Sequence, residues 1–227
     1  MPTSQAPPRP GYRDGARAAA PLAVADLAFG TSFGVLAHGA GFGNAAAVVM
    51  SATTFAGSAQ IAATSVLATG GGVAAAVTAA LLLNLRYLPI GLSTAAALSG
   101  PRWRTALTAQ LVVDESWALA QRQGGRIDRS VLLGAGLTLY VSWLAGTAAG
   151  VVAGAFVGDP ARLGLDAAFP ALFLALLVPQ LRSRSRLLAA AGGAAVALAL
   201  TPVASPGVPL LAATVACLFG AGARRPA

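Results

Sequence analysis

Four charged side chains interrupt long apolar stretches of this 227-residue sequence: Asp26, Arg86, Asp114 and Glu115. If these stretches cross a bilayer, each charge at its centre costs about 2.5 to 3.5 kcal/mol. Such residues usually face the interior of a helix bundle, where they pair with one another or bind a solute. The four residues are therefore the first candidates for a functional site.

Asp114 and Glu115 are adjacent in the sequence. Neighbouring side chains on a helix diverge by about 100°, so both acids cannot point at one partner. We expect one to face Arg86 or a solute, and the other to face a loop or a second cavity. Two interpretations of the Arg86 cluster stay open. It is either an ion pair that only fixes helix register, or a site where Arg86 binds the carboxylate of a zwitterion and an acid binds the ammonium group.

A second polar cluster lies within the stretch F-A-G-S-A-Q at residues 55–60. Gln60 needs several hydrogen-bond partners if it lies at mid-depth in a membrane. A helix broken near Gly57 would let freed backbone groups and Ser58 contact a substrate, as in many transporters. A simple packing kink is the alternative.

The composition predicts the fold class that must position these residues. Apolar residues make up 56% of the chain and charged residues only 10%, too few charges to cover a water-facing surface. Since a span needs about 20 apolar residues, we predict an all-α, polytopic integral membrane helical bundle with about eight transmembrane segments, seven being possible. Residues 1–15 are predicted to form a disordered cytoplasmic arm, and residues 16–227 the transmembrane transporter domain.

Apolar length and the positions of Gly and Pro predict the individual spans. Asp26 falls in the first, Arg86 in the third, and Asp114 with Glu115 in the fourth, which could instead be re-entrant. The predicted spans are 18–40, 44–69, 73–99, 104–120, 131–157, 165–181, 187–203 and 208–222.

The charge pattern predicts the orientation. All 15 basic residues are arginines, and they lie between the apolar blocks. With both termini in the cytoplasm, eleven arginines lie inside against three outside, as the positive-inside rule requires. We therefore predict an N-in, C-in, multi-pass protein of the bacterial cytoplasmic membrane, in contact with lipid, and no binding of nucleic acid despite the net charge of +8.

The residue inventory argues against cofactor chemistry. One cysteine, Cys217, and one histidine, His38, cannot form a Cys/His metal cluster. A chain without lysine has no Walker-type ATP site. We expect no metal, no cofactor and no enzymatic activity, because no nucleophile, base and metal combination is visible.

Glycines recur every four residues at Gly146, Gly150, Gly154 and Gly158. A stripe of small residues lets a second helix approach closely. The helix could belong to this chain, or to a partner subunit or a second copy.

Several motifs together resemble those of the AzlC family of branched-chain amino acid permeases. They are L-A-F-G-T-S-F-G-V-L at 27–36, F-A-G-S-A-Q at 55–60, N-L-R-Y at 84–87 and D-E-S-W-A-L at 114–119. The resemblance covers about residues 21–121 and implies export of neutral amino acids such as leucine, with a small AzlD-like membrane subunit as partner. Tyr87 stands where family members commonly have histidine, so one candidate proton carrier is missing.

We therefore expect a secondary transporter that exports branched-chain and related neutral amino acids, driven by the proton gradient. The expected substrate-binding residues are Gly57, Ser58, Gln60, Asn84 and Arg86, and the acids Asp26, Asp114 and Glu115 would carry protons or form ion pairs. A passive channel, or a structural subunit that does not itself transport, is the alternative.

Overall fold

The computed structural model describes residues 11–98, 100–122, 125–156 and 183–204, with positions 174, 177, 178, 181, 208, 209, 212 and 213. The described residues form helices and no named strand, which agrees with the predicted all-α class. The helices are α1 (Tyr12–Gly39), α2 (Asn44–Thr54), α3 (Gly57–Ala68), α4 (Val73–Asn84), α5 (Tyr87–Thr94), α6 (Arg102–Ala109), α7 (Asp114–Ala120), α8 (Arg129–Phe156) and α10 (Arg184–Leu200).

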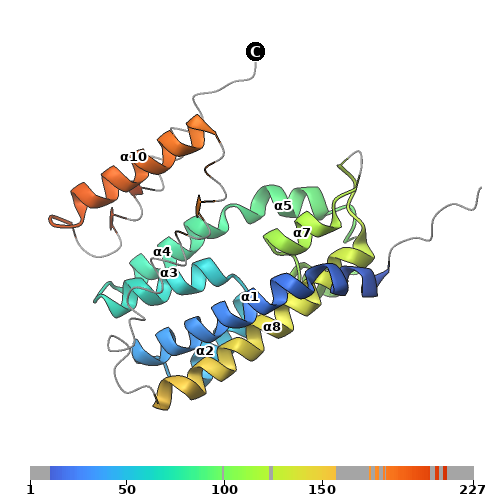
Figure 1. The fold of residues 1–227 in the computed structure, drawn as a ribbon, viewed down its shortest axis with the longest axis horizontal. Helices are drawn as coiled ribbons and strands as arrows, with labels where there is room; N and C mark the ends of the chain where they lie inside the picture. The colour runs from blue at the N-terminus through green and yellow to red at the C-terminus, as the bar shows by residue number, and fades with distance from the viewer. Residues whose placement is uncertain are drawn as a thin grey trace, which may run out of the picture.

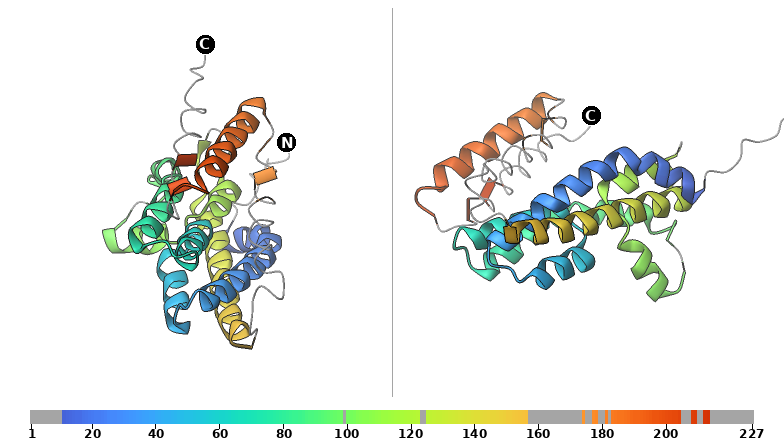
Figure 2. Two further views of the ribbon diagram at one scale, coloured as in Figure 1. Left: turned by 90° about the vertical axis from the view of Figure 1, so that its left-hand side faces the viewer. Right: turned by 60° about the horizontal axis from the view of Figure 1, so that its bottom comes forward.

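The two longest helices, α1 and α8, run side by side along the molecule (Figures 1 and 2). Each has 28 residues, or about 42 Å at 1.5 Å per residue, enough to cross a hydrocarbon core of about 30 Å. In Figure 1, α3, α4, α5 and α7 lie along one side of this pair, and α10 lies apart from it. Asp26 on α1 and Trp143 on α8 therefore project from two helices packed directly against each other.

Glycines allow α1 and α8 to touch backbone to backbone. A methyl group added at Gly150 would overlap the carbonyl oxygen of Thr31, and one at Gly146 would overlap that of Leu27. Gly154 faces the side chain of His38, whose Cβ would lie 2.9 Å from an added methyl group. These three glycines thus pack against α1 of the same chain, while Gly158 lies outside the described residues.

Three of the predicted spans are interrupted. The predicted span 44–69 divides into α2 and α3, 73–99 contains α4 and α5 at an angle of 45°, and 104–120 divides into α6 and α7. Apolar length alone does not reveal where backbone hydrogen bonding stops, so the span limits did not give the positions of these breaks. A break in the span 44–69 near Gly57 was expected, and it occurs at Phe55 and Ala56.

Each break has its own local geometry. Phe55 ends α2 with left-handed backbone angles, φ 39° and ψ 54°, which bulky residues rarely adopt. Between α4 and α5, Pro89 has no N–H to donate to the carbonyl of Leu85. Before α7, Val113 is extended, with φ −124° and ψ 170°.

The described residues contain two helices long and apolar enough to cross a membrane, or three if the bent pair α4–α5 forms one span. The two long helices are α1 and α8, which correspond to the predicted first and fifth spans. The helix α10 overlaps the predicted span 187–203, whereas 165–181 and 208–222 lie mostly outside the described residues. The eight-span count and the N-in, C-in orientation stay predictions.

The first helix begins earlier than expected. Residues 1–10 lie outside the described part, but α1 begins at Tyr12, within the arm predicted for 1–15. The backbone N–H of Gly11 donates to Oδ2 of Asp14 at 2.7 Å, which stabilises a helix start. The last residues of the predicted arm are therefore helical.

Candidate functional site

The central contact of the site is an ion pair between two helix breaks. Nε of Arg86, in the bend between α4 and α5, lies 3.0 Å from Oδ2 of Asp114, the first residue of α7. Both side chains are 40% exposed. The structure thus brings together Arg86 and one of the two adjacent acids, as expected.

The ion pair opens into a cavity of about 560 Å³, within the size range of small-molecule sites. We call this cavity the charged pocket. It is formed by α1, α3, α7 and α8 with the three helix breaks, and its lining residues are Asp26, Phe29, Phe55, Gly57, Ser58, Ile61, Arg86, Tyr87, Val113, Asp114, Glu115, Trp117, Ala118 and Trp143.

Glu115 lines the same pocket as Asp114. The expectation that the second acid would face a loop or another cavity was therefore wrong. The reason is that α7 begins at Asp114, so the first turn stands at the edge of the pocket and both of its acids reach it.

Carboxyl groups outnumber cations in the charged pocket. Among the described lining residues, Asp26, Asp114 and Glu115 stand against one guanidinium, that of Arg86. Among the described residues, neither Asp26 nor Glu115 forms an ion pair. Two carboxyl groups are therefore available for an ammonium group or for protons.

Aromatic side chains orient the charged groups. The Tyr87 hydroxyl accepts a hydrogen bond from Nη2 of Arg86 at 3.4 Å, and the guanidinium lies 5.1 Å from the Tyr87 ring centre. Trp117 donates from Nε1 to the Ser93 hydroxyl at 2.8 Å, which ties α7 to α5. Tyr87 thus holds Arg86 where a histidine would be expected from the family resemblance.

Sequence reasoning missed the tryptophans as pocket residues. Trp117 and Trp143 were not among the expected site residues, but both line the charged pocket. A signal existed for Trp117, since it follows Asp114 by three residues and so shares a helix face with it. No comparable local signal marks Trp143, which lies on the distant helix α8.

Of the expected substrate-binding residues, Arg86, Gly57 and Ser58 line the charged pocket. The Ser58 hydroxyl is buried and has no hydrogen-bond partner in the described part of the chain. Gly57 leaves room for the Trp143 ring, whose nearest atom would lie 2.6 Å from an added Cβ. A side chain at residue 57 would therefore displace Trp143.

Gln60, an expected substrate contact, is not among the described residues that line the charged pocket. It is fully buried, donates from Nε2 to the Ser51 hydroxyl at 3.0 Å and accepts from the Ala56 N–H at 3.3 Å. The Ser51 hydroxyl also accepts from Nε1 of Trp143 at 3.1 Å and lies 2.8 Å from that of Thr147. Gln60 thus belongs to a buried network that joins the α2–α3 break to α8.

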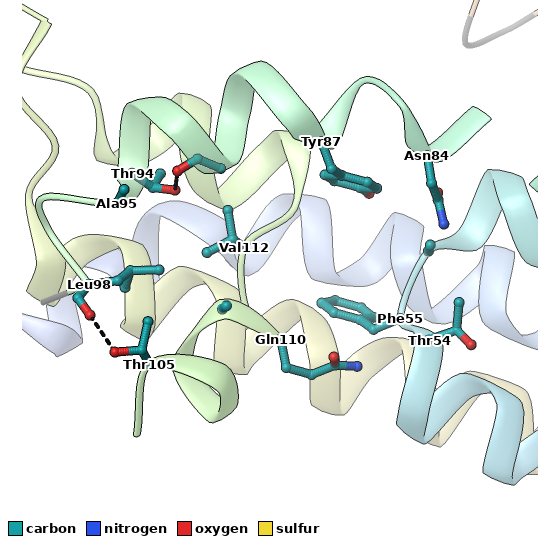
Figure 3. A pocket seen from close by; sticks show the side chains of 13 residues that line it. Thr54, Phe55, Asn84, Tyr87, Thr94, Ala95, Leu98, Thr105, Gln110 and Val112 are labelled. Carbon is teal, nitrogen blue, oxygen red and sulfur yellow. Dashed lines mark hydrogen bonds between the residues drawn. The ribbon is translucent and has the colours of Figure 1, made fainter. Parts of the chain in front are cut away.

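Asn84 lines a different cavity, of about 400 Å³, which we call the neutral pocket (Figure 3). None of its described lining residues is charged. They are Thr54, Phe55, Ala56, Asn84, Tyr87, Gly91, Thr94, Ala95, Leu98, Thr105, Ala109, Gln110 and Val112. The Asn84 Oδ1 atom is buried without a hydrogen-bond partner in the described structure.

Comparisons with known proteins agree with this architecture. Residues 21–157 match the family described as AzlC protein. An uncharacterized membrane protein of Archaeoglobus fulgidus is 31% identical over 90% of this chain and 91% of its own length. The inner membrane protein YgaZ of Escherichia coli is 27% identical over 82% of this chain and 80% of its own length.

The match to the family extends over α1 to α8, which carry every residue of the charged pocket. No solved structure matches this chain. The extent of the match to the family and to the archaeal relative shows that the chain is a membrane protein of the AzlC family.

Proposed function

We propose that this protein is a secondary transporter that exports branched-chain and related neutral amino acids across the bacterial cytoplasmic membrane. The observation that carries the proposal is the composition of the charged pocket, in which one guanidinium faces three carboxyl groups within about 560 Å³. A neutral amino acid is a zwitterion with an apolar side chain, so it needs one cation, one anion and an apolar wall. The charged pocket offers all three.

Arg86 is the proposed partner of the substrate carboxylate. Its Nε is used by Asp114, but a guanidinium has five N–H donors, so others remain for a second carboxylate. Asp26 or Glu115 would bind the ammonium group, since neither forms an ion pair within the described residues. Phe29, Ile61 and Trp143 line the same pocket and would contact an aliphatic side chain.

Proton coupling follows from the surplus of carboxyl groups. An acid in the interior of a membrane protein is a frequent proton carrier, and Asp26 and Glu115 line the pocket without a cationic partner of their own in the described residues. Proton entry through one of them would supply the energy for export. The missing histidine leaves this role to the acids.

A small AzlD-like membrane subunit is the proposed partner. The family resemblance suggests it, and the outer face of α4 and α5 leaves apolar side chains uncovered. Leu81, Leu88 and Leu92 are 62%, 63% and 80% exposed. The α8 glycine stripe supports no such contact, because Gly146, Gly150 and Gly154 already pack against α1.

The test is counterflow of radiolabelled leucine in proteoliposomes that contain the purified chain, with and without the small subunit. We expect saturable counterflow that Arg86→Ala abolishes. Arg104→Ala is the matched control, because Arg104 stacks on Trp103 and lines neither pocket. Unsaturable flux would indicate a passive channel, and no flux under any condition would indicate a non-transporting subunit.

A further inference from the structure

The charged and neutral pockets lie on opposite sides of the helix breaks. At the α2–α3 break, Ala56 lines the neutral pocket and Gly57 the charged pocket. Before α7, Val112 lines the neutral pocket, whereas the next residue, Val113, lines the charged one. The backbone is extended at Val113, and successive side chains of an extended chain point to opposite faces. The wall between the pockets is therefore about one residue thick at these points.

The third break repeats this arrangement. Asn84, the last residue of α4, lines the neutral pocket, and Arg86, two residues later, lines the charged pocket. Three interruptions that are far apart in the sequence thus form one partition.

Two aromatic residues belong to both pockets. Phe55 and Tyr87 line the charged and the neutral cavity alike, so the cavities adjoin at these side chains. Figure 3 shows the two rings on either side of the neutral pocket, one at the α2–α3 break and one at the start of α5. Phe55 lies edge-on to Tyr140, with ring centres 5.1 Å apart.

We propose that the neutral pocket is a second substrate compartment and that Phe55 and Tyr87 form the gate between the two compartments. The proposal rests on the proposed function for the identity of the solute, a neutral amino acid. The buried Oδ1 of Asn84 has no partner in the described residues and can accept a hydrogen bond from an ammonium group. Because none of its described lining residues is charged, the neutral pocket binds the zwitterion less tightly than the charged pocket and favours its release.

The contacts of Arg86 link the gate to the substrate. The guanidinium donates to the Tyr87 hydroxyl at 3.4 Å, a long hydrogen bond. A substrate carboxylate that binds Arg86 competes for the same donors and is a stronger acceptor than a phenol. Occupation of the charged pocket therefore releases Tyr87 from its position at the boundary between the two pockets.

The adjacent valines provide a test that needs no substrate. Val112→Cys and Val113→Cys are made separately in a Cys217→Ser background, which removes the only native cysteine. Each is treated with a charged, membrane-impermeant methanethiosulfonate in right-side-out and in inside-out vesicles. We expect the two cysteines to react from opposite faces, each about tenfold or more faster from its own face, because an alternative conformation is typically populated at about 0.1 to 10%.

Opening the gate should remove this sidedness, that is, the difference in cysteine reaction rate between the two faces of the membrane. Phe55→Ala, or Tyr87→Ala if that variant fails to accumulate, should make both cysteines react from both faces. Leu107→Ala is the control, since Leu107 is exposed on α6, is in neither pocket lining and should leave the sidedness unchanged. Three results would overturn the proposal. They are reaction of both cysteines from one face, no reaction at Val112→Cys, and sidedness that neither gate variant changes. Leucine counterflow tests the proposed function separately, so either can fail alone.

Discussion

Arg86 and Asp114 meet at 3.0 Å, although each lies at the interruption of a different predicted span. Both are 40% exposed, and a solvent-accessible ion pair of this kind contributes only about 0 to 1 kcal/mol to stability. The contact orients a guanidinium at the wall of a cavity.

Replacing Arg86 separates a binding role from a structural one. Arg86→Lys keeps the charge but loses the fork that binds a carboxylate bidentately. We expect leucine binding to weaken by about tenfold to a hundredfold, since hydrogen bonds to charged groups contribute about 1.5 to 3 kcal/mol. Equilibrium binding of radiolabelled leucine to protein in nanodiscs measures this. Abundance in the membrane should stay near that of the wild type and of Arg104→Ala, and a selective loss of protein would instead favour the purely structural ion pair.

Neutralising Glu115 should uncouple transport from the proton gradient. Glu115 lines the charged pocket without an ion pair in the described residues, so Glu115→Gln removes a proton carrier while retaining the size of the side chain. We expect leucine counterflow to persist and leucine accumulation driven by an imposed pH gradient to disappear. Asp14→Asn, an exposed acid in the first turn of α1, is the control. If Glu115→Gln still accumulates leucine, Asp26→Asn is the next variant, and coupling that survives in both would exclude these acids as the carriers.

The contact between α1 and α8 predicts opposite effects for two glycines. Gly150→Ala would drive a methyl group into the carbonyl oxygen of Thr31, so we expect destabilisation of about 1 to 3 kcal/mol. Gly192 on α10 has open space around the same position, and Gly192→Ala should stabilise its helix by about 0.5 to 1 kcal/mol. Thermal unfolding in detergent compares the two variants. Equal midpoints would contradict the close packing of α1 on α8.

The network around Ser51 makes a second prediction about stability. Ser51→Ala would leave the donors of Gln60 and Trp143 without their acceptor in a fully buried site, which costs about 1 to 3 kcal/mol. Thr64 is equally buried, but its hydroxyl has no partner among the described residues. Thr64→Val should therefore be neutral or stabilising. Unfolding midpoints test both variants, and a larger loss for Thr64→Val would show that the network is assigned wrongly.

Part of this architecture can be predicted from composition and local pattern. The length and polarity of the apolar stretches indicate helices in a membrane, because a bilayer requires long apolar segments whose backbone is satisfied internally. The cost of a charge in such a segment singles out Asp26, Arg86, Asp114 and Glu115. The four-residue spacing of Gly146, Gly150 and Gly154 likewise predicts a close helix contact. Each of these signals comes from residues near one another in the chain.

Only the tertiary structure decided how these groups combine. Gln60 turned out to belong to a buried network and Glu115 to the charged pocket, while Asn84 and Arg86 line different cavities although they are two residues apart. These outcomes depend on where three helices break. A break is tolerated where other segments satisfy the freed backbone and polar groups, as Gln60 does for the N–H of Ala56. Gln60 is in turn joined through Ser51 to Trp143, which lies 92 residues from Ser51, so local hydrophobic pattern carries no record of this network.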